Sequence, residues 1–128
     1  MTLFEECLLV LGDSTELSTN ETLELYNLMA ESFPMTSWGR IDWGRVERKQ
    51  RLQYSNLLSK IGDVDLNEEV YIIWDEVTLP AVKTNLKKAL LVIDDVTAVS
   101  FDTWIFCPEV KIVIEFYHES DIHIGWKV

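Results

Sequence analysis

Two histidines near the C-terminus are the first side chains of this sequence that could do chemistry. His118 and His123 flank a polar stretch, and with Glu119 or Asp121 as a third ligand they could hold a zinc ion. A pair of histidines beside a turn is more often simply exposed on the surface than part of a metal site. We therefore expect neither a metal site nor another cofactor here.

Adjacent carboxylates are the second candidate for chemistry. They occur as Glu68 with Glu69, Asp75 with Glu76, and Asp94 with Asp95. General acid–base catalysis needs two carboxylates in different environments, one with its pKa raised by burial. Adjacent acids at the ends of elements are more often caps or exposed charges. The sequence also lacks a P-loop, G-x-G-x-x-G, H-E-x-x-H, C-x-x-C or G-x-S-x-G pattern. We expect a binding protein rather than an enzyme.

The charge of the chain is strongly acidic and unevenly distributed. Its 22 Asp and Glu against 11 Lys and Arg leave a net charge of −11. Residues 40–51 form a basic island between two acidic stretches. A negative field speeds association with a basic partner and repels nucleic acid and anionic membranes. Trp38 and Trp43 beside the island could stack bases, but the surrounding acids favour an internal role for the basic residues. We expect no direct nucleic-acid or membrane binding.

Length and composition predict one globular domain over residues 1–128. The hydrophobic fraction of 48% is too high for a disordered chain of this charge. Cys7 and Cys107 are flanked by apolar residues, which favours buried free thiols in a reducing compartment. No secretory signal and no apolar run long enough for a membrane span is visible. These features predict a cytoplasmic protein.

Hydrophobic spacing predicts the elements that must position these side chains. Thr2 with Glu5, and Ser18 with Glu21, form capping boxes for two N-terminal helices that end at Gly12 and Pro34. We predict a strand near 40–46, leave 47–54 unassigned, and expect a helical turn over 55–61 that stops at Gly62.

The rest of the chain alternates between strand and helix patterns. Strands are predicted at 69–75, 103–107, 110–117 and 122–128, with a central helix capped by Thr78 and extending to Ile93. The last two strands should form a hairpin around 118–121. The predicted fold class is α/β (α+β): two N-terminal helices and the central helix pack on a mostly antiparallel sheet of about four to five strands.

Three segments carry a resemblance to a known family. The opening MTLFEECL, the WGRIDW of residues 38–43 and the C-terminal IEFYHESDIHIGW resemble the small CdiI-type immunity proteins of bacterial contact-dependent growth inhibition. The resemblance implies a cytoplasmic antitoxin without enzymatic activity. Such a protein binds the delivered C-terminal toxin domain, very often a nuclease, and blocks its active site or substrate surface. The alternative is an acidic interaction or scaffold domain for another basic partner, or a homo-oligomer built through exposed aromatic residues, which no feature of the sequence specifically indicates.

The resemblance supplies no binding motif, so we place the interface by the density of acids near aromatic residues. We predict a one-to-one complex with a basic toxin domain, in which exposed aromatic residues act as anchors. The WGRIDW segment is expected to be structural, with Trp38 and Trp43 in the core or as a lid and Arg40 paired with an acid. The predicted toxin-binding residues are Asp75, Glu76, Asp94, Asp95, Asp102 and Trp104, together with Tyr117, His118, Glu119 and Asp121 around the hairpin turn.

Overall fold

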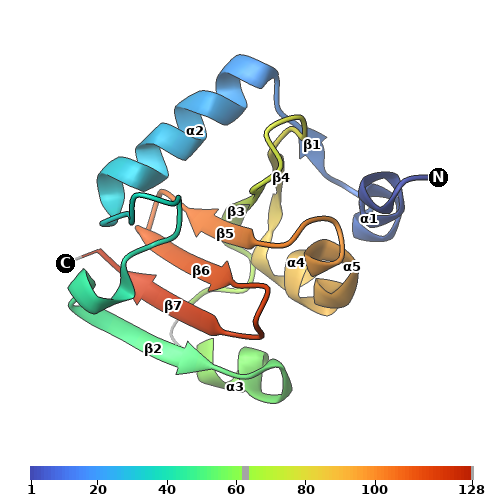
Figure 1. The fold of residues 1–128 in the computed structure, drawn as a ribbon. Coiled ribbons are helices and arrows are strands. Elements are labelled where there is room, and N and C mark those ends of the chain that lie inside the picture. The colour runs from blue at the N-terminus through green and yellow to red at the C-terminus, as the bar shows by residue number, and fades with distance from the viewer. Residues whose placement is uncertain (62–63, 128) are drawn as a thin grey trace.

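An antiparallel sheet crosses the protein, whose computed structural model describes residues 1–61 and 64–127 (Figure 1). Every pair of neighbouring strands is antiparallel. Within those residues the sheet has seven strands, in the order β1 (Thr15–Glu16), β4 (Val82–Asn85), β3 (Glu69–Trp74), β5 (Thr103–Cys107), β6 (Ile112–Phe116), β7 (Ile122–Trp126) and β2 (Arg48–Leu52). The predicted α+β class and antiparallel pairing are confirmed, but the sheet is larger than predicted.

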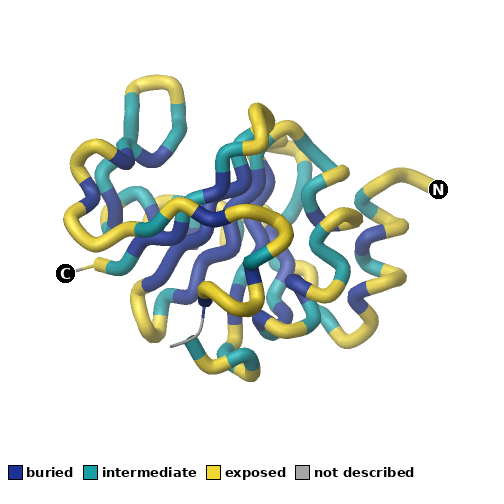
Figure 2. The backbone as a smooth tube through the Cα atoms, turned by 90° about the horizontal axis from the view of Figure 1, so that it is seen from below, coloured by how far each residue is buried: buried dark blue, intermediate teal, exposed yellow. Residues whose placement is uncertain are grey.

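Helices cover the sheet on both faces. The described residues form five α-helices: α1 (Leu3–Leu11), α2 (Thr19–Ser32), α3 (Leu57–Ile61), α4 (Leu86–Leu91) and α5 (Ile93–Thr97). Residues on one strand face join α1, α3, α4 and α5 in one core cluster, while residues on the other face pack against α2 and the chain that follows it. Because both faces are covered, the central strands are buried along most of their length (Figure 2). Within the described part of the chain, no helix is both long and apolar enough to cross a membrane.

The two N-terminal helices begin as predicted. The side chains of Thr2 and Ser18 accept hydrogen bonds from the backbone N–H groups of Glu5 and Glu21, whose carboxylates accept the reciprocal bonds. A single cap of this kind contributes about 1 kcal/mol to helix stability. The C-cap of α1 is Gly12, whose φ of 73° is readily adopted by glycine.

The predicted central helix over 78–93 is wrong in its first half. Residues Val82–Asn85 form β4, and only Leu86–Leu91 and Ile93–Thr97 are helical. Val82 and Thr84 pair with Ile72 and Val70 of β3, so long-range pairing overrides the helical spacing of the apolar residues. Asn85 caps α4 by accepting a hydrogen bond from the Lys88 N–H at 2.8 Å.

The predicted strand near 40–46 is also wrong. Residues 43–45 form a short 3-10 helix, and the edge strand β2 follows at Arg48–Leu52, in the stretch left unassigned. Only Leu52 of β2 is buried, which explains why no alternation of apolar residues marks this strand. The helical turn expected over 55–61 is present as α3 and the preceding 3-10 turn. Its predicted stop at Gly62, and the end of the last strand at Val128, lie outside the described residues.

The C-terminal hairpin is confirmed. Strands β6 and β7 pair with Phe116 opposite Ile122, and the Tyr117 N–H donates to the Asp121 carbonyl at 2.9 Å across the turn. Gly125 of β7 lies beneath Trp43, where a Cβ would fall 2.7 Å from the indole ring. The hairpin therefore holds the 3-10 segment close against the sheet face that α2 covers.

Candidate functional site

A buried carboxylate organises the end of the sheet where β6 approaches the segment after α2. Glu115 is fully buried, and its Oε1 accepts hydrogen bonds from Arg40 Nε at 2.8 Å and Trp43 Nε1 at 2.9 Å. Its Oε2 accepts from the Ile41 N–H and from Trp104 Nε1, both at 3.0 Å. The expectation that Arg40 pairs with an acid is confirmed, and of the two positions expected for Trp43, core or lid, the structure shows the core. Glu115 was not predicted as the partner, because 75 residues separate it from Arg40.

The guanidinium of Arg40 also connects this cluster to the hairpin turn. It lies 3.8 Å from the centre of the Tyr117 ring, and its Nη2 is 3.7 Å from Asp121 Oδ2. Burial alone would lower the pKa of Arg40, but the hydrogen bond and charge of Glu115, with the charge of Asp121, raise it above its ordinary value. Arg40 is therefore a permanent cation committed to internal contacts.

The remaining basic residues of the 40–51 island also have internal partners. Arg45 pairs with Asp42, Arg48 lies over the Trp126 ring, the Lys49 ammonium donates to the Trp43 carbonyl, and Arg51 pairs with Asp121. This is the internal role that the sequence favoured for the island.

Three strand ends bring predicted site residues into one row. Trp74, Thr103 and Phe116 lie opposite one another across β3, β5 and β6, so the residues one position beyond them, Asp75 and Asp102 among them, are also neighbours. Asp75 Oδ1 accepts hydrogen bonds from the Ser100 hydroxyl and, at 3.2 Å, from the Asp102 N–H.

A second carboxylate contact extends the row to the hairpin. Asp102 Oδ1 accepts from the N–H of His118 at 2.9 Å and lies 2.9 Å from its Nδ1. The hydrogen-bonded path therefore runs from β3 through β5 to the residues that follow β6. This path fixes the relative positions of Asp75, Asp102 and His118.

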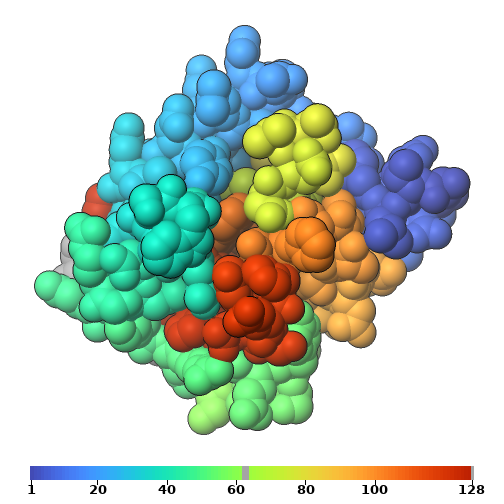
Figure 3. Space-filling view, viewed as in Figure 1, coloured from blue at the N-terminus to red at the C-terminus, as the bar shows by residue number. Residues whose placement is uncertain are grey.

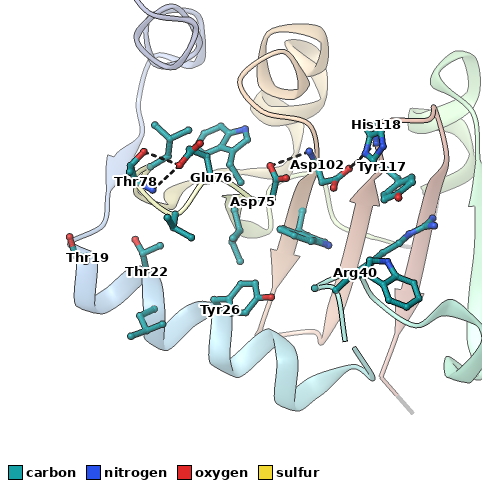
Figure 4. Close-up of a pocket in the computed structure, with 18 residues that line it drawn as sticks. Thr19, Thr22, Tyr26, Arg40, Asp75, Glu76, Thr78, Asp102, Tyr117 and His118 are labelled. Carbon is teal, nitrogen blue, oxygen red and sulfur yellow. Dashed lines mark hydrogen bonds and ion pairs between the residues drawn. The ribbon is translucent and has the colours of Figure 1, made fainter. Parts of the chain in front are cut away.

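The row forms one wall of a cleft of about 700 Å³ (Figures 3 and 4). Figure 4 shows Thr22 and Tyr26 rising from α2 on the opposite side, and Figure 3 shows the hollow between α2, the teal segment after it and the yellow turn that follows β3. Residues of that turn and of the loop at 38–40 complete the lining. Trp104 and Arg40 also line the cleft, so the buried Glu115 holds two of its wall residues in place.

Exposed apolar side chains surround the acids at the mouth of the cleft. Val77 is 93% exposed and Trp38 is 73% exposed, and the exposed Leu23 of α2 lies on the same lining. Phe101, 79% exposed, packs edge-on against His118 beside the mouth. Trp38 is therefore not in the core, unlike Trp43. Large exposed apolar residues next to charges are typical of protein-interaction surfaces.

The structure brings most of the predicted binding residues to this cleft. Six of them line it: Asp75, Glu76, Asp102, Trp104, Tyr117 and His118. Asp121 contacts the cleft residue Arg40, whereas the exposed Glu119 lies in the turn beside it. The exposed Asp94 and Asp95 belong to α5, which packs against α1 and shares its core cluster. No described ion pair or hydrogen bond of their side chains links those two acids to the cleft.

The histidines have separate surroundings. His118 contacts Asp102, whereas His123 stacks on Trp43 with 4.9 Å between ring centres, and burial followed by the charge of Arg40 lowers the pKa of His123. Among residues 1–61 and 64–127, no group of three His, Cys, Asp or Glu side chains is placed to hold a metal ion.

The cleft thus combines acids, aromatic rings and exposed apolar groups, an arrangement suited to binding.

Comparison with known proteins identifies a family for the chain. Residues 1–125 match the model of a family described as CdiI immunity protein EcoliA0-like. No curated protein matches the chain. Because the match covers nearly every residue, it includes the buried Glu115 cluster and all the walls of the cleft. The chain belongs to the CdiI family of immunity proteins.

Proposed function

We propose that the protein binds the C-terminal toxin domain of a contact-dependent growth inhibition system, one-to-one and in the cytoplasm, and neutralises it. The match of residues 1–125 to the CdiI immunity family is the observation that carries this proposal. An immunity protein acts by occupying a surface that the toxin needs, so it requires a binding face rather than catalytic groups.

The partner that fits the charge of the chain is a basic toxin domain, in particular a nuclease. A nuclease holds phosphates with a positive surface, and carboxylates presented there would occupy the place of phosphates. The net charge of −11 supports fast capture, because electrostatic steering raises association rates to about 10⁸–10⁹ M⁻¹s⁻¹ at low salt. Fast capture suits an inhibitor that must bind a toxin before it damages the cell.

The cleft face is the part of the surface that best fits such a partner. Asp75, Glu76 and Asp102 supply carboxylates, and the exposed rings of Trp38 and Phe101 supply anchors beside them. Binding energy in interfaces concentrates in aromatic and arginine anchors surrounded by weaker contacts. Glu119 and Asp121 extend the face along the hairpin turn, while Asp94 and Asp95 on α5 contribute mainly to the long-range field.

Co-production with the toxin domain encoded immediately upstream tests the proposal. Cells that make the toxin domain together with this protein should grow, and cells that make the toxin domain with an unrelated immunity protein should stop growing. The purified pair should elute as a one-to-one complex. Cell death despite soluble immunity protein, or co-purification with a housekeeping partner only, would contradict the proposal and favour the alternative of a general acidic interaction domain.

A further inference from the structure

The cleft is large enough to admit more than the edge of a flat partner. Its volume of about 700 Å³ falls within the range of pockets that enclose whole ligands. Apolar and aromatic side chains such as Tyr26 and Ile73 line it together with threonine hydroxyls and charged groups. A concave surface of this kind receives a projecting element, so the shape indicates which of the two proteins inserts into the other.

The charge of the cleft indicates what that element carries. Among the described residues, no ion pair involves Asp75 or Glu76, whereas Arg40, the cation on the lining, is paired with Glu115. Asp75 Oδ1 accepts two hydrogen bonds from within the chain, and neither donor carries a positive charge. The cleft therefore presents negative charge that the protein does not neutralise itself.

One wall of the cleft already holds a cation between an aromatic ring and a carboxylate, and a cationic side chain of a partner could bind in the same way. The guanidinium of Arg40 lies over the Tyr117 ring, and the Glu115 carboxylate accepts a hydrogen bond from its Nε–H group. Tyr26 of α2 and Trp104 of β5 supply a second pair of rings on the lining, which contact edge-to-face at 6.2 Å between centres. A lysine or arginine entering between these rings and Asp75 would meet the same combination of ring and carboxylate.

We infer that the cleft receives a projecting segment of the toxin that carries a lysine or arginine flanked by an apolar residue. The cationic group lies against Asp75 and Glu76, and the apolar neighbour packs on the exposed Leu23, Trp38 and Val77 at the mouth. This inference rests on the proposed function, since it names what the toxin contributes. The immunity protein then works by capturing an element of the toxin rather than by inserting one of its own.

A photo-crosslinking amino acid at Tyr26 tests the insertion directly. Tyr26 lies on the α2 wall, so a benzophenone side chain there reaches only a segment that has entered the cleft (Figure 4). Benzophenone is carried by an enlarged phenylalanine, which keeps the ring against Trp104. The control position is the exposed Leu9 of α1, which is not among the residues that line the cleft.

We expect the cognate toxin domain to crosslink to the Tyr26 position and not to the Leu9 position. Mass spectrometry should place the crosslink in a toxin segment that contains lysine or arginine. A one-to-one complex without a crosslink at Tyr26, or with one to a segment free of basic residues, overturns the inference and leaves the proposed function standing. Absence of any complex between the wild-type chain and its toxin domain overturns both.

Isosteric neutralisation keeps the test independent of the bulky probe. The double variant Asp75→Asn with Glu76→Gln keeps oxygen acceptors for Ser100, Asp102 and Thr78 but removes both charges. We expect it to weaken affinity for the toxin domain by at least about tenfold, mainly through faster dissociation. The matched variant Asp94→Asn with Asp95→Asn should change dissociation by less than about twofold. Equal dissociation rates for the two double variants would overturn the inference.

Discussion

Glu115 and Asp75 are two carboxylates at the same end of the sheet with opposite surroundings. Glu115 is fully buried and accepts hydrogen bonds from four donors, one of them the cationic Arg40. Asp75 is exposed, and no described ion pair involves it. The first charge is neutralised by contacts inside the protein, whereas the second would be available to the partner proposed above. The contrast teaches that net charge alone does not indicate a binding surface, because some acids are already neutralised inside the protein.

The largest effect that distinguishes the two carboxylates should be on stability. In Glu115→Gln, the new NH₂ group would replace a carboxylate oxygen that now accepts two hydrogen bonds, and would face the two donors of those bonds. Arg40 would also lose its buried counter-ion. We expect the free energy of unfolding to fall by about 3–5 kcal/mol, as when one partner of a buried ion pair is removed. Urea denaturation of the purified variant measures this loss.

The exposed carboxylate provides the matched control for that measurement. Asp75→Asn keeps the oxygen that accepts from Ser100 and Asp102, so unfolding should change by no more than about 0.5 kcal/mol. Equal losses from Glu115→Gln and Asp75→Asn would remove the distinction between a structural and a binding carboxylate.

A smaller effect should appear in the pH dependence of stability, and it should come from His123, a neighbour of the buried Glu115. His123 lies opposite Glu115 in the β6–β7 pair, and burial, followed by the charge of Arg40, lowers its pKa in the folded protein, while Asp121 and Glu115 oppose this. The unfolded chain therefore binds a proton more readily once the pH drops below about 6.5. Stability contributed by neutral His123 is present above that pH and is lost as the pH falls toward its folded pKa.

The variant His123→Phe should reduce this loss while retaining a ring to stack on Trp43. Urea denaturation at pH 7.5 and pH 5.5 gives, for each protein, the change in the free energy of unfolding between the two pH values. The free energy of unfolding should fall more in the wild type than in the variant. Because both proteins share every other titrating group, the difference between them isolates His123. An identical loss in the two proteins would show that protonation of His123 is not coupled to folding.

The sequence was sufficient for elements whose signals are local. The capping boxes at Thr2 and Ser18, the buried strand over 69–74 and the C-terminal hairpin all lie where the pattern predicts them. Local patterns failed at 78–85, because the apolar spacing of Val82 and Leu86 suits a helix as well as a strand followed by a helix. Pairing with β3, about a dozen residues earlier along the chain, decided between them.

The candidate site shows the same division. Acids at strand ends were a useful signal for Asp75 and Asp102, because strand register brings those ends together. Asp94 and Asp95 were expected directly after a helix that ends at Ile93, and nothing local indicated that a separate helix, α5, begins at Ile93 and includes them. Glu115 was missed because its donors come from segments 11 to 75 residues away, and only the folded sheet places two tryptophans and an arginine around it.

The most direct test of the central claim, that the cleft face contacts the toxin, is a comparison of two charge reversals by binding kinetics. Asp75→Lys with Glu76→Lys and Asp94→Lys with Asp95→Lys change the net charge equally, so both should slow association by weakening the long-range field. Only the cleft pair should also speed dissociation of the cognate toxin domain, by at least about tenfold, at a temperature where circular dichroism shows both variants of the immunity protein to be folded. Dissociation that is accelerated equally by both reversals, or only by the α5 reversal, would contradict the account.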